Sequence, residues 1–559
     1  MKIERRFLTL PDGKQIHYRM SGRGPAMILM HPSPISSEAL IPAISVFSKK
    51  FTCIALDTPG YGLSDDSVAE KEGLWGYADA VALTLDAFKL ESAVIYGAAT
   101  GAQIGIQFAK RYPQRTRLLI LDGAGHFSDE DKARAAESYF IDLTPRRDGS
   151  HLLAAWDASR HLSTFFPWMS GRLEDRIQAD AAPLSFVQHH VNDMLRAGPD
   201  YRIAYWEAMK GESHANTVEV GVPTLLSNNT GSIIRPLTEA LIAPGLPDNF
   251  TVVPSTPETR HQALLDAAAI YAGDPACPAP PPQTNTKPTI QNAMVRVPGG
   301  QLRARLCLEG EGLPLIAIHD PAGSSHLVEP VFDPYVGRRP VIAFDNPGNG
   351  ESDAVIDTLN SETYAQVLNA ALDELGFEEV DVLGRYSGGP VAMEMSFQRP
   401  ERVQHIVQAG VSFYEGEEQT SLIENYTPSV APRWDGSHLM TAWSIMRDQS
   451  LYWPWFNQTK DGILWTDGAI DVALTDLRTR ELLKCGDRYQ DAYNAMWRYP
   501  MRDKLPKLSV PCLLCHPSWE PVGYTTALAQ AVDPRCKSAE LAAGMADWHT
   551  DLDAFFNTP

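Results

Sequence analysis

The chain has 559 residues, of which 44% are apolar and 21% are charged, as in an ordinary globular protein. A single hydrophobic core stops growing near about 250–300 residues, so we expect two large domains. The formal net charge of −21 disfavours nucleic acid and anionic membrane surfaces as partners, because both attract basic proteins.

The cellular setting is indicated by what the sequence lacks. The N-terminal segment has no apolar core of a signal peptide, and no run of about 18 apolar residues could span a bilayer. Seven cysteines are too few for a disulfide framework, so we expect a cytoplasmic protein. Cys512 and Cys515 form a lone C-x-x-C in a strand-like run. Residues three apart on a strand face opposite sides, which favours core packing over metal binding.

An internal repeat with a period of about 288 residues is the clearest large-scale feature. The loop Asp57–Asp65 recurs 288 positions later as Asp345–Asp353, with its proline and both glycines retained. The box Asp148–Leu152 recurs 287 positions later as Asp435–Leu439. Registers that agree this closely predict two copies of one domain.

A proline-rich segment separates the two copies. Residues 274–288 contain six prolines, which favours an extended, semi-rigid linker over a packed core. We therefore expect one domain at 1–273 and a second at 289–559.

Within each half, strand-like and helix-like segments alternate. Short continuous apolar runs are typical of buried parallel strands; in the first half they lie at 26–30, 52–56, 117–121 and 222–226. A long helical stretch interrupts each half, at about 128–212 and about 413–503. This order predicts an α/β fold in which each half is a doubly wound, mostly parallel sheet with a helical cap.

One short stretch in each half joins a strand to a helix through a turn framed by glycines. In Val94–Gly101 the residue at the centre of the frame is Ala99, and in Val382–Gly388 it is Tyr386. A strand, a glycine-framed turn and a helix are the setting of the Gly-x-Ser-x-Gly nucleophile elbow. Neither copy has the serine.

Each half thus resembles an α/β-hydrolase-fold domain. The resemblance rests on the His31–Pro34 segment after the first strong strand, the D-x-P-G-x-G-x-S-D loop, the glycine-framed turn, the cap and a late histidine. It covers nearly the whole chain. It implies the fold, whereas the reaction has to be argued from the site, because the family includes esterases, dehalogenases, C–C bond hydrolases, lyases, cofactor-free oxygenases and inactive members.

The resemblance places Ala99 and Tyr386 at the position of the nucleophile. Alanine cannot form an acyl intermediate. A phenol with a pKa near 10 is about one-thousandth ionised at neutral pH, so Tyr386 is better suited to donate a hydrogen bond or a proton. Ser387 lies beside it and would become the nucleophile only if the register slipped by one residue.

The resemblance also implies positions for an acid and a histidine. In the second half Glu520 occupies the acid position, and a solvated loop glutamate is the alternative. The matching loop 227–236 of the first half has no carboxylate, and Ser232 lies nearest the position. His261 and His549 occupy the histidine position in the two halves, and His549 is the better candidate because only its half offers a candidate carboxylate partner, Glu520.

An oxyanion hole needs two backbone N–H donors. The resemblance implies that one comes from the residue after the elbow centre, Thr100 or Ser387. If the other lies two residues past the early histidine, the first half offers Ser33, whereas the second has Pro321, which lacks an N–H. Acyl transfer of the serine type is therefore disfavoured in both halves.

Four further histidines are candidates for the pocket. His31 and His319 are expected to orient the loop after the first strong strand. His151 and His438 lie in the repeated Asp-Gly-Ser-His-Leu box, whose other residues suit a helix N-cap. The second cap is also rich in tryptophan, as expected of a pocket for an apolar or aromatic molecule: Trp434, Trp443, Trp453, Trp455, Trp465 and Trp497.

Three functions are compatible with these residues. The first is an enzyme in which His549, oriented by Glu520, acts as general base and Tyr386 as donor, in hydrolysis, lyase-type cleavage or cofactor-free oxygenation. The second is a catalytically inactive binding or scaffold protein. The third is a serine hydrolase that uses Ser387.

The expected partners follow from the same residues. We expect a small-molecule substrate, packing of the two domains within the chain, and no metal or cofactor, because no metal set, G-x-G-x-x-G or P-loop motif occurs. The oligomeric state is left open.

Overall fold

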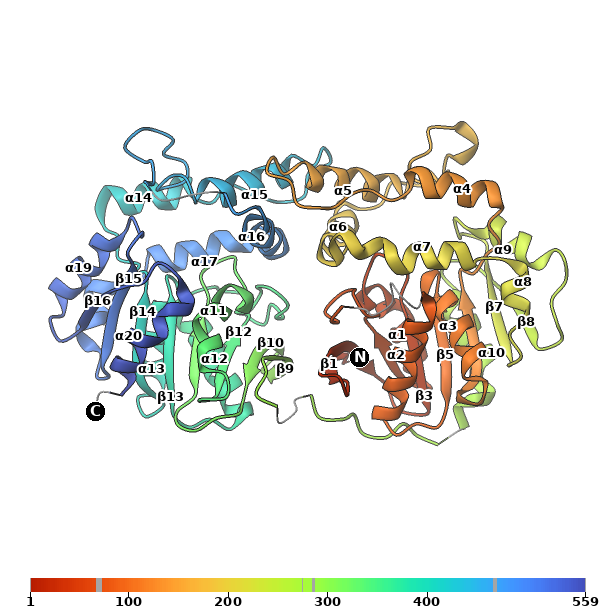
Figure 1. Cartoon of the computed structure of the whole chain (residues 1–559), viewed down its shortest axis with the longest axis horizontal. Helices are drawn as coiled ribbons and strands as arrows, with labels where there is room; N and C mark the ends of the chain where they lie inside the picture. Colours follow the sequence, from red (N-terminus) through yellow and green to blue (C-terminus); the bar gives the residue numbers. More distant parts are fainter. Residues whose placement is uncertain (1, 67–72, 274, 284–286, 466–469, 558–559) are drawn as a thin grey trace. The chain divides into compact units, whose positions relative to one another are not determined.

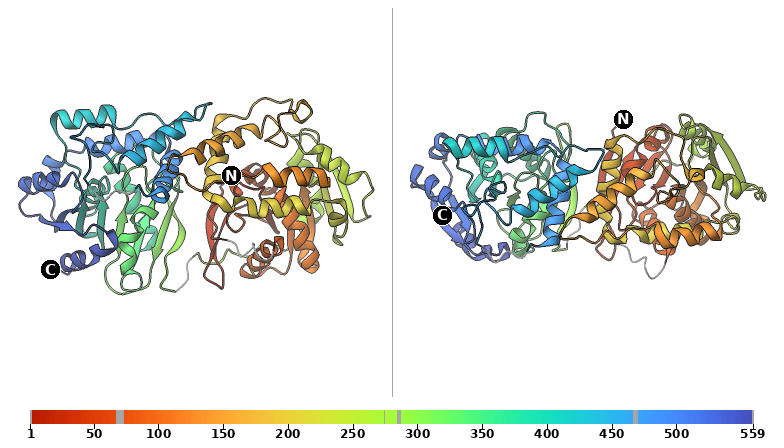
Figure 2. Two further views of the ribbon diagram at one scale, coloured as in Figure 1. Left: turned by 45° about the horizontal axis from the view of Figure 1, so that its top comes forward. Right: turned by 90° about the horizontal axis from the view of Figure 1, so that it is seen from above.

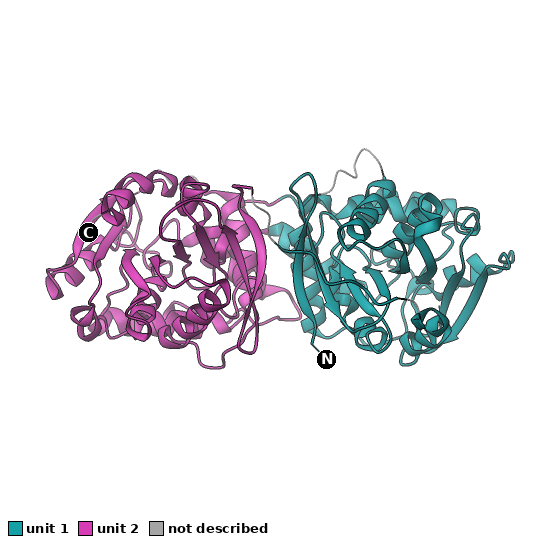
Figure 3. Cartoon of the chain, turned by 90° about the horizontal axis from the view of Figure 1, so that it is seen from below, with its two compact units in different colours: residues 1–144, 150–283 teal, residues 145–149, 284–559 magenta. Residues whose placement is uncertain are grey.

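The computed structural model describes residues 2–66, 73–273, 275–283, 287–465 and 470–557. It divides into two compact units, residues 1–144 with 150–283 and residues 145–149 with 284–559 (Figure 3). The proline-rich segment lies across this division, and its residues 274 and 284–286 are outside the described ranges. Its described part, 275–283, contains no helix or strand, and the Arg6 side chain donates a hydrogen bond to the carbonyl of Pro281.

The first unit is built on one eight-stranded sheet of order β1-β2-β4-β3-β5-β6-β7-β8. Strands β1 and β2 form an antiparallel hairpin, β2 pairs antiparallel with β4, and the remaining pairs are parallel. The strands are β1 (Glu4–Thr9), β2 (Gln15–Ser21), β3 (Ala26–Met30), β4 (Thr52–Leu56), β5 (Ala93–Ala98), β6 (Thr116–Asp122), β7 (Thr224–Asn229) and β8 (Phe250–Ser255).

Helices cover both faces of this sheet, as a mostly parallel sheet requires (Figure 1). One face packs on α2 (Leu74–Ala87), α3 (Thr100–Arg111) and α9 (Arg235–Ile242). The other packs on α1 (Ile41–Phe47) and α10 (Arg260–Ala268).

The second unit has a sheet of the same connectivity, β9-β10-β12-β11-β13-β14-β15-β16. Its strands are β9 (Gln291–Val297), β10 (Gly300–Cys307), β11 (Leu315–Ile318), β12 (Val341–Phe344), β13 (Val380–Arg385), β14 (Val403–Ala409), β15 (Cys512–Pro517) and β16 (Lys537–Leu541). One face packs on α12 (Ser361–Leu375), α13 (Gly388–Gln398) and α19 (Gly523–Val532), and the other on α11 (Glu329–Phe332) and α20 (His549–Phe556). Two mostly parallel sheets with helices on both faces confirm the predicted fold class.

Each unit carries further helices over the carboxyl ends of its parallel strands (Figure 2). In the first unit these are α4 (Asp129–Ser138), α5 (Ser150–His161), α6 (Leu184–Ala197) and α7 (Arg202–Gly211). In the second they are α14 (Gly416–Asn425), α15 (Ser437–Asp448), α16 (Val472–Cys485) and α17 (Arg488–Trp497). We refer to each set as the cap of its unit.

The two cysteines of the C-x-x-C pattern are buried in β15 and belong to different apolar clusters. Cys512 packs with α12 and α13, and Cys515 packs with α11 and α20 on the other face of the sheet. Among the described residues, no helix is long and apolar enough to cross a membrane.

Candidate functional site

The turn after β13 is held in a strained conformation by its glycines. Tyr386 has φ +46°, and Ala99 at the matching place after β5 has φ +48°. A Cβ on Gly384 would lie 2.1 Å from the backbone of Gly388, so only glycine allows this approach. A Cβ on Gly410, after β14, would lie 2.5 Å from the Tyr386 ring, so glycine there makes room for the large central residue.

A cavity of about 240 Å³ lies beside this turn, between the sheet and the cap of the second unit. Tyr386, Arg385, Asp320 and Glu520 line it from the sheet side, and Gln449 and Arg478 line it from the cap. Its walls are largely aromatic: Tyr414, Tyr426, Trp453, Tyr493, Trp497 and Trp519. This composition is typical of a site for a small organic molecule.

Tyr386 and Glu520 form the central polar pair of the cavity. The phenol hydroxyl of Tyr386 donates a hydrogen bond to the Glu520 carboxylate. Burial raises the pKa of Tyr386 above its usual range, and the neighbouring carboxylate acts in the same direction. Burial also raises the pKa of Glu520, which the Tyr386 hydrogen bond and Arg385 oppose. The phenol is therefore neutral at ordinary pH and acts as a donor, not as a phenolate nucleophile.

Two charged residues that the sequence analysis missed lie next to this pair. The Arg385 guanidinium lies 5.4 Å from the centroid of the Tyr386 ring, and its Nη1 lies 3.9 Å from Oδ1 of Asp320. Burial alone would raise the pKa of Asp320, but Arg385 and Arg478 lower it below its usual value. Their positions in the sequence could have identified them, because Arg385 directly precedes the central residue of the turn and Asp320 directly follows His319.

His549 is not among the described residues that line the cavity. It is the first residue of α20, and its Nδ1 lies 2.8 Å from the carbonyl oxygen of Ala546. Glu520, the expected partner of His549, accepts the hydrogen bond of Tyr386. The structure thus brings together two members of the predicted set, Tyr386 and Glu520, and the role of His549 as a base stays a prediction.

In the first unit, a cavity of about 20 Å³ is lined by Tyr139, Trp168, Tyr201 and Tyr205 among others, and Ala99 is not among its described lining residues. This is room for about one water molecule. No organic substrate of the size that the second cavity accepts can enter it as it stands.

The predicted oxyanion hole of the first unit is occupied by a side chain. The backbone N–H of Ser33 donates to the hydroxyl of Thr100, at 3.3 Å. The donor is therefore already paired within the chain. Beside Ala99, which has no reactive atom, this arrangement offers no place for an oxyanion.

His261 of the first unit packs against the helix on the same face of the sheet. Its ring centroid lies 5.8 Å from that of Phe47, and its Nε2 lies 3.2 Å from a guanidinium nitrogen of Arg260. Burial lowers the pKa of His261 to about 4, and Arg260 contributes in the same direction. The imidazole is therefore neutral near pH 7.

His31 and His319 bind the loops that follow their strands. His31 Nε2 accepts the backbone N–H of Thr58 at 3.0 Å, and His319 Nε2 accepts that of Asn346 at 2.9 Å. Nδ1 of His31 lies 2.9 Å from the carbonyl oxygen of Pro32. Each ring thus holds its own loop to the D-x-P-G loop of the same unit.

The box histidines lie inside the caps. His151 and His438 are both fully buried, and neither is among the described residues that line the two cavities. Nδ1 of His438 accepts the backbone N–H of Arg433 at 3.1 Å, and burial lowers the pKa of His438 to about 4. Ser387, the alternative nucleophile, lines a separate cavity of about 10 Å³.

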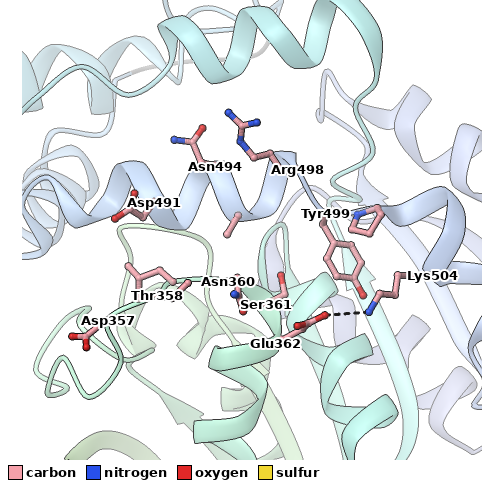
Figure 4. Close-up of a pocket in the computed structure, with 13 residues that line it drawn as sticks. Asp357, Thr358, Asn360, Ser361, Glu362, Asp491, Asn494, Arg498, Tyr499 and Lys504 are labelled. Carbon is pink, nitrogen blue, oxygen red and sulfur yellow. Dashed lines mark hydrogen bonds and ion pairs between the residues drawn. The ribbon is translucent and has the colours of Figure 1, made fainter.

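A second, more open hollow of about 570 Å³ lies on the second unit between the start of α12 and the end of α17 (Figure 4). Glu362 and Lys504 face each other across it, with their charged atoms 3.4 Å apart. Lys504 pairs with Glu362 and with Glu394, and Tyr499 is the one aromatic residue among the residues described as lining the hollow. Within the described ranges, no cluster of three or more His, Cys, Asp or Glu residues could hold a metal ion.

Comparison with known proteins decides the family. Residues 25–208 and 314–441 match the family described as the alpha/beta hydrolase fold. The chain belongs to this family. Its two units are α/β-hydrolase-fold domains, which we call the first and the second domain.

Individual relatives match only part of the chain. A 2-hydroxy-6-oxononadienedioate/2-hydroxy-6-oxononatrienedioate hydrolase of Klebsiella pneumoniae is 34% identical over 90 residues, which are 16% of this chain and 30% of the relative. A 2-(acetamidomethylene)succinate hydrolase of Mesorhizobium japonicum is 30% identical over 105 residues, 19% of this chain and 37% of the relative. The chain thus matches about a third of the length of these relatives. A bromoperoxidase structure from Bacillus anthracis is 20% identical with a TM-score of 0.37, covering 48% of this chain and 97% of its own.

Proposed function

We propose that the second domain is an enzyme that cleaves a small aromatic or apolar molecule, by hydrolysis or a lyase-type step, without a covalent serine intermediate. The observation that supports this proposal is the Tyr386–Glu520 hydrogen bond beside the aromatic cavity, with Tyr386 at the nucleophile position of the family. The named relatives are hydrolases of small acids, which agrees with hydrolysis.

The pair is suited to moving a proton. In hydrolysis, a water molecule would lose its proton to the Glu520 carboxylate as its oxygen bonds to the substrate carbon. Tyr386 would donate its hydrogen bond to the substrate oxygen on which negative charge develops. When the carbonyl forms again, the bond from carbon to the leaving group breaks, and the leaving group takes the proton back from Glu520. The raised pKa of Glu520 makes its carboxylate a stronger base than an exposed glutamate, since a higher pKa means a greater affinity for the proton.

The test is turnover of a panel of aryl esters, lactones and C–C bond substrates. Tyr386→Phe and Glu520→Gln should each lower kcat/KM roughly 10²- to 10⁴-fold, the usual contribution of a positioned proton donor or acceptor. Tyr499→Phe is the matched control. Tyr499 also donates to a glutamate, Glu394 at 2.7 Å, but it does not line the cavity. Equal losses in Tyr386→Phe and Tyr499→Phe would reject the proposal.

His549→Ala distinguishes the proposed pair from the histidine base that the family resemblance implies. A loss as large as that of Glu520→Gln would assign the base to His549 and require it to move toward the cavity. Labelling by a fluorophosphonate would instead support Ser387 as a nucleophile, and we expect none.

A non-catalytic binding protein is the second candidate. The observation that favours it is that no histidine is among the described residues lining the cavity. Binding of the panel without turnover would support this function. Oxygen consumption with the same compounds would support the third alternative, cofactor-free oxygenation. We propose that the first domain is not catalytic in any of these cases, given Ala99 and the filled hole at Ser33.

A further inference from the structure

Two side chains of the second cap present hydrogen-bond donors to the cavity. Arg478, on α16, donates from Nη2 to Oε1 of Gln449, at the end of α15. This bond fixes the Gln449 amide, so that its Nε2 is the remaining donor. Nε2 of Gln449 is buried and has no hydrogen-bond partner in the described part of the chain.

Arg478 also lacks a contacting carboxylate. Within the described ranges, no carboxylate lies within the 4.0 Å of a salt bridge to its guanidinium, although it lines the cavity and is only partly exposed. Arg480, on the same helix, does have such a partner, since it pairs with Asp476 at 2.8 Å. Arg478 lowers the pKa of Asp320, so the two charges act on each other across the cavity without an ion pair, and a guanidinium in a cavity is stabilised further when an anion contacts it.

The two carboxylates of the cavity have other partners. Glu520 accepts from Tyr386, and Asp320 lies next to Arg385. Both are on the sheet side, whereas Arg478 and Gln449 are on the cap. The cavity therefore has contacting charges at the sheet and, at the cap, a guanidinium that acts on Asp320 from a distance but that no described carboxylate contacts.

We infer that the ligand of this cavity carries a carboxylate, which binds Arg478 and Gln449, while its aromatic or apolar body lies among the walls and its reacting group faces Tyr386. This inference rests on the proposed function for the choice of cavity. A carboxylate has two oxygens in one plane, which suit two donors on adjacent side chains. It would also give Arg478 a contacting ion pair, which it does not have within the described ranges. The ligand is thus bound at two ends, by charge at the cap and by Tyr386 at the sheet.

The experiment compares probes that differ only in charge. Benzoate and phenylacetate, with benzamide and phenylacetamide as neutral isosteres, are titrated into the full chain, and binding is followed by tryptophan fluorescence and calorimetry. We expect each acid to bind roughly 10- to 100-fold more tightly than its amide, the range of a charge-assisted pair of hydrogen bonds. Equal affinities for acid and amide would overturn the inference, and this comparison needs no variant.

Variants then locate the anion. Arg478→Gln should remove most of the preference for the acid, and Gln449→Met should reduce it by a smaller factor. Arg480→Gln is the control, because Arg480 is on the same helix but pairs with Asp476. The inference would be overturned if Arg478→Gln and Arg480→Gln had the same preference for the acid over the amide. Circular dichroism of each variant verifies that the fold is retained.

The inference and the proposed function fail in different ways. If the acids bind no better than the amides but Tyr386→Phe abolishes turnover, the inference is wrong and the proposed function stands. If the acids bind through Arg478 but no member of the substrate panel is turned over, the inference stands and the proposed function is wrong.

Discussion

Glu212 is a buried carboxyl group in the first domain. Its side chain is 5% exposed, and its Oε2 has no hydrogen-bond partner among the described residues. Burial raises the pKa of Glu212 to about 8, which Lys132 opposes only in part. At neutral pH the folded protein therefore holds this group mostly protonated.

Its titration makes stability depend on pH. Below about pH 4.5 the group is protonated in both the folded and the unfolded chain, so it has no effect. Between about pH 4.5 and pH 8 the unfolded chain loses the proton and the folded one keeps it. The free energy of unfolding therefore falls as pH rises, by up to roughly 1.4 kcal/mol per pH unit.

We predict that Glu212→Gln removes this dependence. The variant should match the wild type at pH 4 and exceed its free energy of unfolding by as much as about 4 kcal/mol at pH 8. The measurement is urea unfolding at several pH values. Glu207→Gln is the control, because Glu207 lies on α7, the helix that ends just before Glu212, and pairs with Lys210 at the surface. The same gain in both variants would show that net charge, not burial, is responsible.

At the residue scale, the sequence predicted the positions of side chains along the chain but not their directions. Tyr386 and Glu520 could be predicted because a glycine frame and a loop after a strand locate them. Arg478 and Gln449 could not, since a cap helix has no motif that says which face meets a cavity. Thr100 was predicted as a hole donor, yet the contact of its hydroxyl with Ser33 depends on a rotamer that the sequence does not determine.

At the scale of elements, α16 positions Arg478, so the start of this helix affects the cavity. Asp471 is its N-cap, and its Oδ1 accepts the backbone N–H of Leu474 at 2.9 Å. Replacing such a cap by alanine costs about 1 kcal/mol.

We predict that Asp471→Ala lowers the free energy of unfolding by about 1 kcal/mol and weakens benzoate binding, because the turn that leads to Arg478 frays. Chemical unfolding and calorimetry measure the two effects. Glu424→Ala, an exposed change on α14, should stay within about 0.5 kcal/mol of the wild type. Unchanged binding in Asp471→Ala would mean that packing alone holds α16 in place.

The strands that the sequence predicted are those with a continuous buried apolar run. β3 and β4 coincide with the apolar runs at 26–30 and 52–56, and both are buried along their whole length. β1, β2 and β8 were not predicted. β1 and β8 are edge strands in which buried residues are interspersed with partly or fully exposed ones, and β2 is largely buried but contains Gln15, His17, Arg19 and Ser21, so none of the three has a continuous apolar run.

At the scale of the whole molecule, the two domains share a strand order but differ in the cavities found among the described residues. The cavity beside the turn of the second domain is about 240 Å³, whereas the aromatic cavity of the first domain is about 20 Å³ and is not lined by Ala99. A search for sequence repeats finds that the two domains have the same fold. It does not find that their cavities differ in size, because cavity size depends on how the cap side chains pack.

We predict that one chain binds about one molecule of benzoate. The smaller cavity has room for about one water molecule and no aromatic ring. The measurement is the stoichiometry of a calorimetric titration at a protein concentration well above Kd. Two equivalent sites per chain would contradict this and would require the first domain to open.

The glycines at the turns have a consequence for how such proteins are recognised. A Cβ on Gly97 would lie 2.1 Å from the carbonyl oxygen of Gly101, and one on Gly101 would lie 2.3 Å from that of Met30. These contacts arise from the path of the backbone and do not involve the residue between the glycines. Selection for a stable fold alone therefore preserves the spacing after the chemistry has changed. A motif search that requires serine between the two glycines overlooks proteins such as this one. A search that accepts any residue at that position finds them, and their activity then has to be measured separately.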